Sequence, residues 1–195
     1  MKVWIVGAQG TCKKEIADLL AEEKFKVGHL FTNIAQDVPI YHKELYKYYD
    51  SEDIKSIFEN NAYVFINNIF DGQDDAYDGL DFSEYDDNNV FVLSVDQFLS
   101  VNTKYISKDD LVVWVDGDKN WRYSNIKNSD SYDVSSRERI EKSQYVGFFN
   151  LINTLKTSTK NVLYFLNEEP ARVKTIIKII ANNPKLKQEF IRNFS

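Results

Sequence analysis

The stretch IVGAQGTCKKEIADLL, residues 5–20, places a turn with two glycines between an apolar run and an amphipathic segment. The run ends at Gly7, Gly10 follows, and Lys13 precedes apolar residues at helical spacing. A strand, a glycine turn and a helix in this order open an α/β unit. Backbone amides at such a turn, together with a helix N-terminus, can surround phosphate oxygens. The stretch therefore predicts an α/β fold with a candidate phosphate-binding loop.

Two residues of this turn depart from the pattern Gly-x-x-x-x-Gly-Lys-Ser/Thr. Cys12 adds a Cβ where the pattern has glycine, and Lys14 places a cation where the pattern has a metal-binding hydroxyl. Thr11 carries a hydroxyl, but at a different position. The turn by itself is consistent with a loop derived from a phosphate-binding loop and also with an ordinary strand–helix turn.

The rest of the chain continues an alternation of strands and helices. Apolar runs predict strands over 2–7, 26–33, 62–70, 90–96, 111–116 and 161–167. Periodic segments predict helices from Thr11 or Cys12 to Glu23 and over 50–61, 135–156 and 169–183, followed by a short helix after Pro184. Asp50 or Ser51 is the expected N-cap of the second helix. This alternation is typical of a parallel sheet covered by helices on both faces.

Composition excludes several classes of protein. The 195 residues are 43% hydrophobic, which is enough for the core of one domain. A net charge of −6 argues against general nucleic-acid binding. One cysteine excludes an internal disulfide and indicates a reducing compartment. No apolar run approaches the ~20 residues of a membrane span, and the N-terminus lacks a signal-peptide pattern. We expect a cytoplasmic protein that binds neither nucleic acid nor membrane.

Over about residues 2–180 the chain resembles the guanylate kinase family. Residues 7–13 match the family's Gly-x-x-Gly-x-Gly-Lys except at Cys12, and YKYYDSEDIKSIFENNAYVFIN (46–67) is similar to its acceptor-binding segment. Later motifs are similar in the same order: AYDG (76–79), VLSVDQF (92–98), SSRERIEKS (135–143) and VLYFLNEEPARVKTIIKII (162–180).

This resemblance implies an α/β P-loop NTPase fold, a three-layer sandwich with a parallel sheet, a small inserted acceptor-binding subdomain and a lid. It divides one domain into a core of residues 1–33 and 90–195, an insertion of about 34–89 and a lid of about 117–136. The implied function is phosphoryl transfer from ATP, with Mg²⁺, to a nucleoside or deoxynucleoside monophosphate. Nucleotides are then the expected small-molecule partners.

The resemblance also implies roles for individual residues. Those implied to bind the nucleotide cofactor are Gly7, Gly10, Thr11, Cys12, Lys13 and Asn167. Those implied to be catalytic are Lys13, Arg122, Arg137, Arg139 and Asp96. Those implied to bind the acceptor are Tyr46, Tyr77, Lys43 and Asp96. Asp96 ends an apolar run and is also the expected contact for Mg²⁺, with Asp116, at the end of another run, as the alternative.

Departures from the family leave a second hypothesis open. No arginine precedes Arg122, whereas the family clamps the acceptor's phosphate with arginines after its second strand. Phe65 stands where the family has the glutamate that reads guanine. Lysine and histidine reproduce the planar fork of arginine only in part, and the candidates are Lys43, Lys47 and His42. The alternative is a catalytically impaired module that binds a nucleotide or a protein partner.

Two other features invite a chemical interpretation. The acidic run DGQDDAYDGLDFSEYDD (71–87) holds eight carboxylates but lacks the ligands of a calcium loop, with Ala76 and Tyr85 at required positions. We expect it to be a solvated surface segment. The thiol of Cys12 at a helix N-terminus is expected to have a lowered pKa and to oxidise readily. With two histidines in the chain, a catalytic Cys–His pair is not supported.

Overall fold

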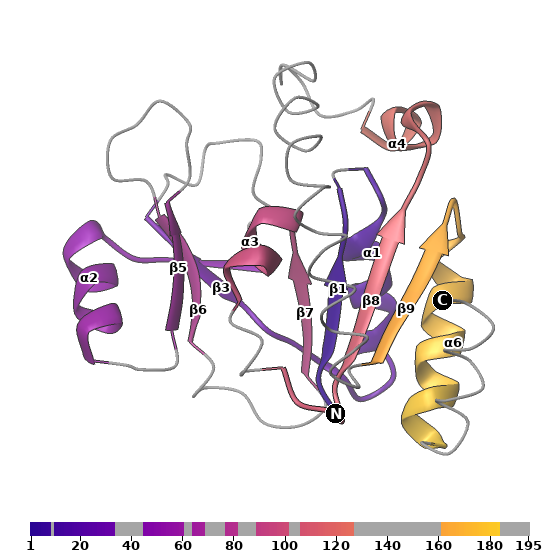
Figure 1. Ribbon diagram of the computed structural model, residues 1–195, viewed down its shortest axis with the longest axis horizontal. Coiled ribbons are helices and arrows are strands. Elements are labelled where there is room, and N and C mark those ends of the chain that lie inside the picture. The colour runs from indigo at the N-terminus through magenta and orange to yellow at the C-terminus, as the bar shows by residue number, and fades with distance from the viewer. Residues whose placement is uncertain are drawn as a thin grey trace.

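The computed structural model describes residues 1–8, 10–33, 45–60, 64–68, 77–81, 89–101, 106–126 and 161–183. These residues form two sheets with helices packed on them (Figure 1). The helices expected over 135–156 and beyond Pro184, and residues 127–136 of the expected lid, lie outside the described residues. No helix in the described part of the chain is both long and apolar enough to cross a membrane.

The larger sheet has five parallel strands: β1 (Val3–Val6), β2 (Lys26–Val27), β7 (Asn89–Leu93), β8 (Leu111–Asp116) and β9 (Asn161–Leu166). Their order across the sheet is β2-β7-β1-β8-β9. The central strand β1 pairs with β7 on one side and β8 on the other. In open parallel sheets, ligands bind at the carboxyl edge, where the strand order changes direction. The turn after β1 lies at such a position.

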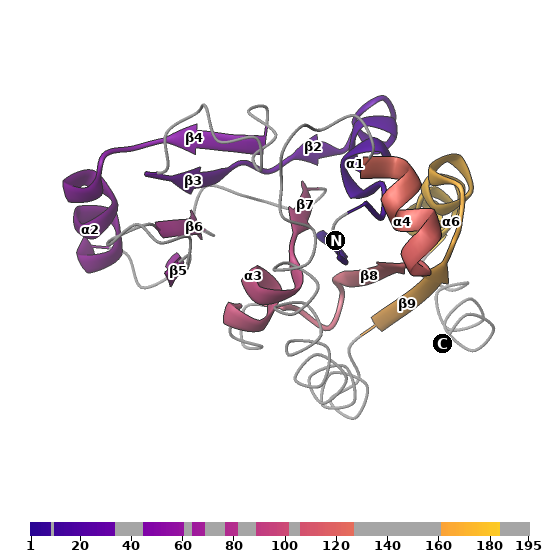
Figure 2. The same cartoon turned by 90° about the horizontal axis from the view of Figure 1, so that it is seen from above.

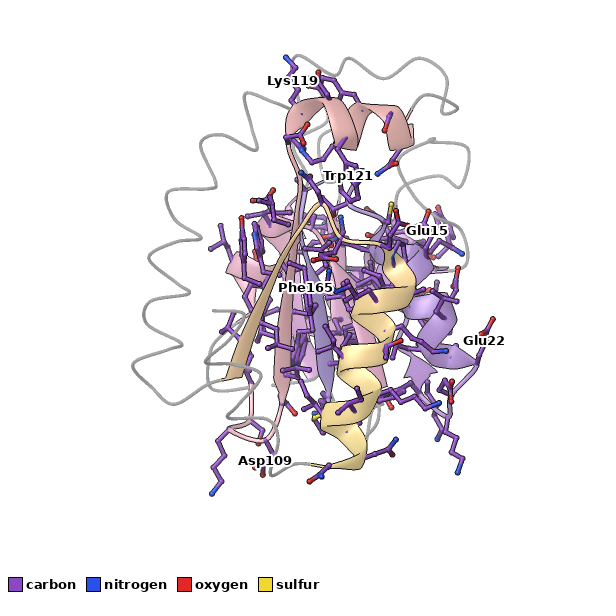
Figure 3. All side chains as sticks on the ribbon, turned by 90° about the vertical axis from the view of Figure 1, so that its right-hand side faces the viewer. Glu15, Glu22, Asp109, Lys119, Trp121 and Phe165 are labelled. Atoms are coloured by element: carbon purple, nitrogen blue, oxygen red, sulfur yellow. The ribbon has the colours of Figure 1, made fainter. Side chains whose placement is uncertain are left out.

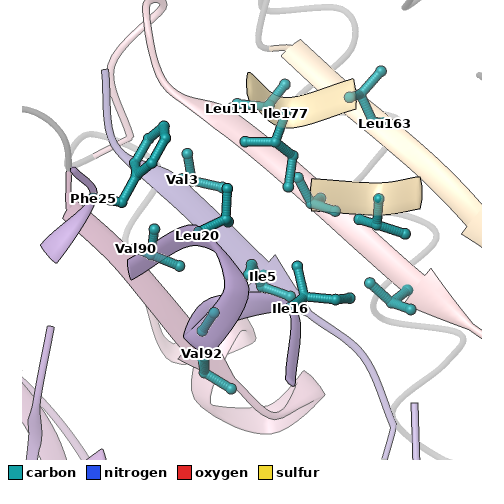
Figure 4. Close-up of a cluster of buried hydrophobic side chains, with 14 of the residues drawn as sticks. Val3, Ile5, Ile16, Leu20, Phe25, Val90, Val92, Leu111, Leu163 and Ile177 are labelled. Carbon is teal, nitrogen blue, oxygen red and sulfur yellow. The ribbon is translucent and has the colours of Figure 1, made fainter. Parts of the chain in front are cut away.

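One face of this sheet is covered by two helices, α1 (Lys13–Ala21) and α6 (Pro170–Asn182) (Figures 2 and 4). Ile16 and Leu20 of α1 and Ile177 of α6 are fully buried against strand residues such as Val3 and Val90. Complete burial of one such aliphatic side chain stabilises the fold by about 1.5–3 kcal/mol. These contacts place the N-terminus of α1 directly after the turn that follows β1.

The opposite face of the sheet has its own core because successive strand residues point to opposite sides. Trp4 stacks on Phe91 of the neighbouring strand, with ring centroids 4.7 Å apart. The helix α3 (Val95–Ser100) buries Phe98 in the same cluster. Burial on both faces explains why the strands read as continuous apolar runs in the sequence.

The second sheet contains β3 (Leu30–Thr32), β4 (Tyr46–Tyr48), β5 (Val64–Asn68) and β6 (Tyr77–Asp81), in the order β4-β3-β6-β5. Strands β3 and β4 are parallel, and the other pairs are antiparallel. The helix α2 (Ser51–Asn60) packs on this sheet through Ile54 against Phe31. Asp50 caps α2 by accepting the backbone N–H groups of Glu52 at 3.0 Å and Asp53 at 2.8 Å. The prediction of this helix and of Asp50 as its cap is confirmed.

The prediction of one strand over 26–33 is wrong. Residues 26–27 belong to the larger sheet and residues 30–32 to the second one. Between them, Gly28 passes so close to the ring of Phe91 that a Cβ would overlap it. The second sheet therefore begins within the segment 1–33 that was expected to belong to the core. The division into domains stays a prediction.

Two other local predictions also differ from the structure. The apolar run 90–96 leaves the strand at Leu93, because Ser94 and Gln97 form a capping box that starts α3. The side chain of Ser94 accepts the Gln97 N–H at 3.4 Å, and Oε1 of Gln97 accepts the Ser94 N–H at 2.8 Å. The acidic run 71–87, expected to be a surface segment, contains β6.

Candidate functional site

The turn after β1 needs glycine at two points for different reasons. A Cβ on Gly7 would overlap the backbone carbonyl oxygen of Val115 in β8, so the chain passes too close to its neighbour for a side chain. Gly10 has φ 80°, a left-handed conformation that glycine adopts without steric cost. These two constraints shape the loop that connects β1 to α1.

Lys13 is the first residue of α1, and its side chain folds back over the loop. Its Nζ donates to the carbonyl oxygen of Ala8 at 2.6 Å. The hydroxyl of Thr11, which is fully buried, donates to the same oxygen at 2.8 Å. The ammonium group thus lies across the loop beside a helix N-terminus. An anion there would meet a positive charge and the first amides of the helix, which lack partners within the helix.

Lys14, in contrast, directs its charge along α1. Its Nζ lies 2.7 Å from Oδ2 of Asp18, one turn further along the helix. The sequence left open whether this lysine faces the loop. The residue after Lys13 thus carries an ammonium group paired with Asp18 where the phosphate-binding pattern has a hydroxyl.

Cys12 is the N-cap of α1 and has the left-handed angles φ 56° and ψ 29°. Its thiol makes no capping hydrogen bond. Burial raises the pKa of this thiol, and the charges of Glu15 and Glu169 raise it further, against the opposing effect of Lys13. The expectation of a lowered pKa is therefore wrong: desolvation and two carboxylates outweigh the nearby cation.

A short helix, α4 (Lys119–Ile126), lies above the carboxyl ends of β1 and β8 (Figure 1). Figure 3 shows its residues Lys119 and Trp121 above the end of the sheet. Nδ2 of Asn125 donates to the carbonyl oxygen of Gly10 at 2.8 Å, which joins α4 to the loop. Arg122, predicted to be catalytic, is half-buried on this same helix. Helix α4, which carries Arg122, is thus hydrogen-bonded to the loop that ends at Lys13.

Asn167 follows β9 and holds the start of α4. Its Oδ1 accepts the Asp118 N–H and its Nδ2 donates to Oδ2 of Asp118, both at 2.9 Å. Oδ1 of Asp118 accepts the Trp121 N–H at 3.0 Å. The hydrogen bond from Trp121, then that from Asn167, lowers the pKa of Asp118. Asn167 was predicted to bind the cofactor, and here its side-chain amide is bonded to Asp118.

Asp116, the alternative metal contact, ends β8 and is engaged by two protein donors. Oδ1 accepts the Gly117 N–H at 2.8 Å, and Oδ2 accepts the hydroxyl of Tyr164 at 3.1 Å. Burial, and then the charge and hydrogen bond of Asp116, raises the pKa of Tyr164 to about 12. Among the described residues, no group of three His, Cys, Asp or Glu side chains could hold a metal ion.

A polar network joins the two sheets where acceptor binding was predicted. Nε2 of Gln97 donates to the hydroxyl of Tyr46 at 2.8 Å and also to Oδ2 of Asp78. Gln97 and Asp78 are 5% and 2% exposed, so these bonds form in the protein interior. They connect α3, next to the larger sheet, to β4 and β6 of the second. Of the three residues, only Tyr46 was predicted to bind the acceptor, and the capping box is the one local sequence signal for Gln97.

The other predicted site residues are placed less completely. Tyr77 is half-buried on β6 beside Ile54, and its N–H donates to Oδ1 of Asn33 at 2.7 Å. Asp96 is the second residue of α3 and does not end a strand, which corrects that expectation. The side chain of Asp96 lies outside the described part of the chain. Three further predicted residues lie entirely outside it: Lys43, Arg137 and Arg139. Their roles stay predictions.

Comparisons with known proteins bear on the fold. No family model matches the chain. No curated protein matches its sequence. Among solved structures, guanylate kinase from Anaplasma phagocytophilum is similar, with a TM-score of 0.55 and 12% sequence identity, over 92% of this chain and 84% of that chain. The predicted fold class is confirmed: the chain has a P-loop kinase-like α/β fold with a parallel five-stranded sheet.

Proposed function

We propose that the chain binds ATP with its triphosphate at the loop after β1 and transfers a phosphoryl group to a nucleoside or deoxynucleoside monophosphate. The observation that carries this proposal is the position of Lys13. Its ammonium group lies 2.6 Å from the Ala8 carbonyl oxygen, across the loop and at the N-terminus of α1. A cation and first-turn amides at one point are the elements that bind a polyphosphate.

The surrounding residues suit the needs of phosphoryl transfer, which depends on positioning and on neutralising negative charge. On the donor side, Lys13 supplies a charge within the loop and Arg122 a second charge from α4, which contacts that loop through Asn125. On the acceptor side, Tyr46 is held at the junction of the two sheets by Gln97. Arg137 and Arg139 are proposed to act from the segment that follows α4.

Mg²⁺ is the metal expected with ATP, and such an ion is held mainly by phosphate oxygens and water, with one or two protein carboxylates. Asp96 is the proposed protein contact. Asp116 suits this role less well, because its two carboxylate oxygens already accept hydrogen bonds from Gly117 and Tyr164. When bound, the ion neutralises charge on the transferring group.

Two observations favour the alternative, a catalytically impaired module that binds a nucleotide or a protein. Cys12 adds a side chain in a left-handed conformation at the N-cap of α1. Lys14 provides an ion pair with Asp18 where the pattern has a hydroxyl for the metal. Both changes affect the metal and phosphate contacts while leaving Lys13 in place, so nucleotide binding without turnover is the expected behaviour of such a module.

One assay separates these functions. Purified protein is mixed with Mg·ATP and a panel of ribo- and deoxyribonucleoside monophosphates, and ADP release is measured for the wild type, Lys13→Ala and Lys14→Ala. Turnover that is lost in Lys13→Ala but retained in Lys14→Ala supports the kinase. Thermal stabilisation by ATP without turnover, lost in Lys13→Ala, supports the binding module. Ligand at 100 times its Kd stabilises by about 2.7 kcal/mol, which is readily measured. Absence of both turnover and stabilisation in the wild type would overturn the proposal.

A further inference from the structure

We infer that Asn125 is a positioning residue for phosphate binding, which acts by fixing the direction of the peptide between Gly10 and Thr11. This inference rests on the proposed function, because it concerns the phosphate site of the same loop. Its starting point is the hydrogen bond of 2.8 Å from Nδ2 of Asn125 to the Gly10 carbonyl oxygen. The two residues are 115 positions apart in the chain, so the contact depends on the placement of α4 over the loop.

The hydrogen bond also determines where the next N–H group points. In a planar trans peptide, the carbonyl of one residue and the N–H of the following residue point in opposite directions. The described residues contain no cis peptide bond. With the Gly10 carbonyl held toward α4, the Thr11 N–H faces away from that helix. A loop that binds an anion needs its carbonyls directed outward so that its N–H groups converge.

Gly10 makes such a lock necessary. A glycine adopts left-handed and right-handed backbone angles with similar ease, so the peptide that follows Gly10 can rotate at little cost. The side chain of Thr11 is fixed by its bond to Ala8, but that bond does not hold the Gly10 carbonyl. Asn125 provides the hydrogen bond that holds this carbonyl from outside the loop.

The other end of α4 is anchored independently of the loop. Asp118 bonds to Asn167 through two hydrogen bonds of 2.9 Å and caps α4 through the Trp121 N–H. With its start fixed, α4 presents Asn125 to the loop at a set height above the sheet. The Asn125 bond is solvent-exposed, so its net contribution to global stability is at the low end for a protein hydrogen bond, and its removal acts mainly on the ligand-binding geometry of the loop.

The test compares ligand affinities of the full-length protein by calorimetry, with ADP and inorganic tripolyphosphate as probes. Asn125→Ala is expected to weaken binding of both probes about three- to tenfold, the effect of losing one hydrogen bond. Asn125→Asp is expected to weaken it further, since a carboxylate cannot donate to the Gly10 carbonyl and repels phosphate. The matched control is Asn120→Ala, which removes an exposed asparagine from the first turn of the same helix.

A spectroscopic measurement separates positioning from a general structural effect. The backbone amide resonance of Thr11 is expected to shift strongly on addition of tripolyphosphate in the wild type and weakly in Asn125→Ala, while the unfolding temperatures of the two free proteins agree. Unchanged affinity in Asn125→Ala, or equal weakening in Asn120→Ala, would overturn the inference and leave the proposed function intact. Failure of the wild type to bind either probe would overturn both.

Discussion

Lys13 and Ala8 are joined across the turn after β1 by a hydrogen bond of 2.6 Å from the ammonium group to the carbonyl oxygen. The Thr11 hydroxyl donates to the same oxygen at 2.8 Å, so one backbone acceptor holds both side chains. The loop itself therefore fixes the position of its positive charge. A charge that is already in place needs no reorganisation when it meets a developing negative charge.

The first prediction concerns Cys12, which keeps a left-handed backbone conformation at the end of this loop. Such a conformation costs an L-residue about 1–2 kcal/mol, whereas glycine adopts it freely but loses more entropy on folding. We expect Cys12→Gly to leave the free energy of unfolding unchanged or to raise it by up to about 1 kcal/mol. Urea unfolding of the two proteins measures the difference.

The control for this prediction is Cys12→Ala, which removes the thiol but keeps a Cβ in the same conformation. It should lack the gain seen in Cys12→Gly. If alanine stabilised the protein as much as glycine, burial of the thiol rather than the backbone conformation would be the source of the effect. The two variants also test whether the added side chain hinders ADP binding, because only glycine clears the space beside Lys13.

Much of the larger sheet could be predicted because its signals are local. An uninterrupted apolar or periodic pattern marks each of β1, β8, β9 and α6 in the sequence. Gly7 and Gly10 mark the turn between β1 and α1. The split of 26–33 into two strands has no comparable signal within the segment. It depends on the close approach of Gly28 to Phe91, which only the packed sheet creates.

The candidate site could be predicted only where its residues are neighbours in the chain. The loop from Gly7 to Lys13 is one such segment. The network of Gln97 joins residues 51 and 19 positions away, Tyr46 and Asp78, and thus depends on how the second sheet folds back on α3. The raised pKa of the Cys12 thiol likewise depends first on burial, which residues 5–20 do not reveal, and then on Glu15, which lies within that stretch.

The second prediction concerns the bonds that Gln97 makes between the two sheets. Gln97→Ala removes both side-chain donors and half of the capping box, and we expect a loss of about 2–3 kcal/mol in the free energy of unfolding. Ser94→Ala is the control, because it removes the capping hydroxyl, leaves the bonds of Gln97 between the two sheets in place, and should cost about 1 kcal/mol. Hydrogen exchange should show the larger effect of Gln97→Ala in β4 and β6, where Tyr46 and Asp78 lie.

Gln97→Glu tests the same network by charge. The variant keeps the shape of the side chain but places a carboxylate against Asp78, in a position that is almost fully buried. Two adjacent buried carboxylates cannot both ionise without a large cost. The destabilisation should therefore be greater at pH 8 than at pH 5. The urea midpoint of the variant is compared with that of the wild type at each pH. If the difference between them were the same at pH 5 and pH 8, the contact between Gln97 and Asp78 would be contradicted.

The third prediction concerns alkaline pH and the hydrogen bond from Tyr164 to Asp116. The pKa of Tyr164 is raised from 10.0 to about 12, so the folded protein retains this proton more strongly than the unfolded chain does. The resulting stabilisation is complete below pH 10 and is lost as the pH rises through 12. Tyr164→Phe should be less stable than the wild type at pH 8, by about 0.5–1 kcal/mol for a partly solvent-screened bond.

The difference between Tyr164→Phe and the wild type should shrink between pH 10 and pH 12, which unfolding in urea at several pH values measures. Tyr48→Phe serves as the control, since Tyr48 is 51% exposed on β4. At pH 8 it should stay within about 0.5 kcal/mol of the wild type. A difference for Tyr164→Phe that stayed constant from pH 10 to pH 12 would contradict the raised pKa of Tyr164, which burial and then Asp116 produce.

The fourth prediction concerns the edge of the larger sheet opposite the loop. Asp110, 3% exposed, accepts the Lys2 N–H and the Ser107 N–H, both at 2.9 Å, and the indole N–H of Trp4 at 3.3 Å. Asp110→Ala leaves these donors without their carboxylate, including a fully buried indole, and should cost about 2–4 kcal/mol of unfolding free energy. Asp109→Ala changes the exposed neighbouring carboxylate and should stay within about 0.5 kcal/mol of the wild type.

Because Asp110 lies at the far edge, its loss should lower stability while leaving the ADP affinity of the folded protein unchanged. If Asp110→Ala lowered both the stability and the ADP affinity, the start of β1 would be shown to transmit strain to the turn at its other end.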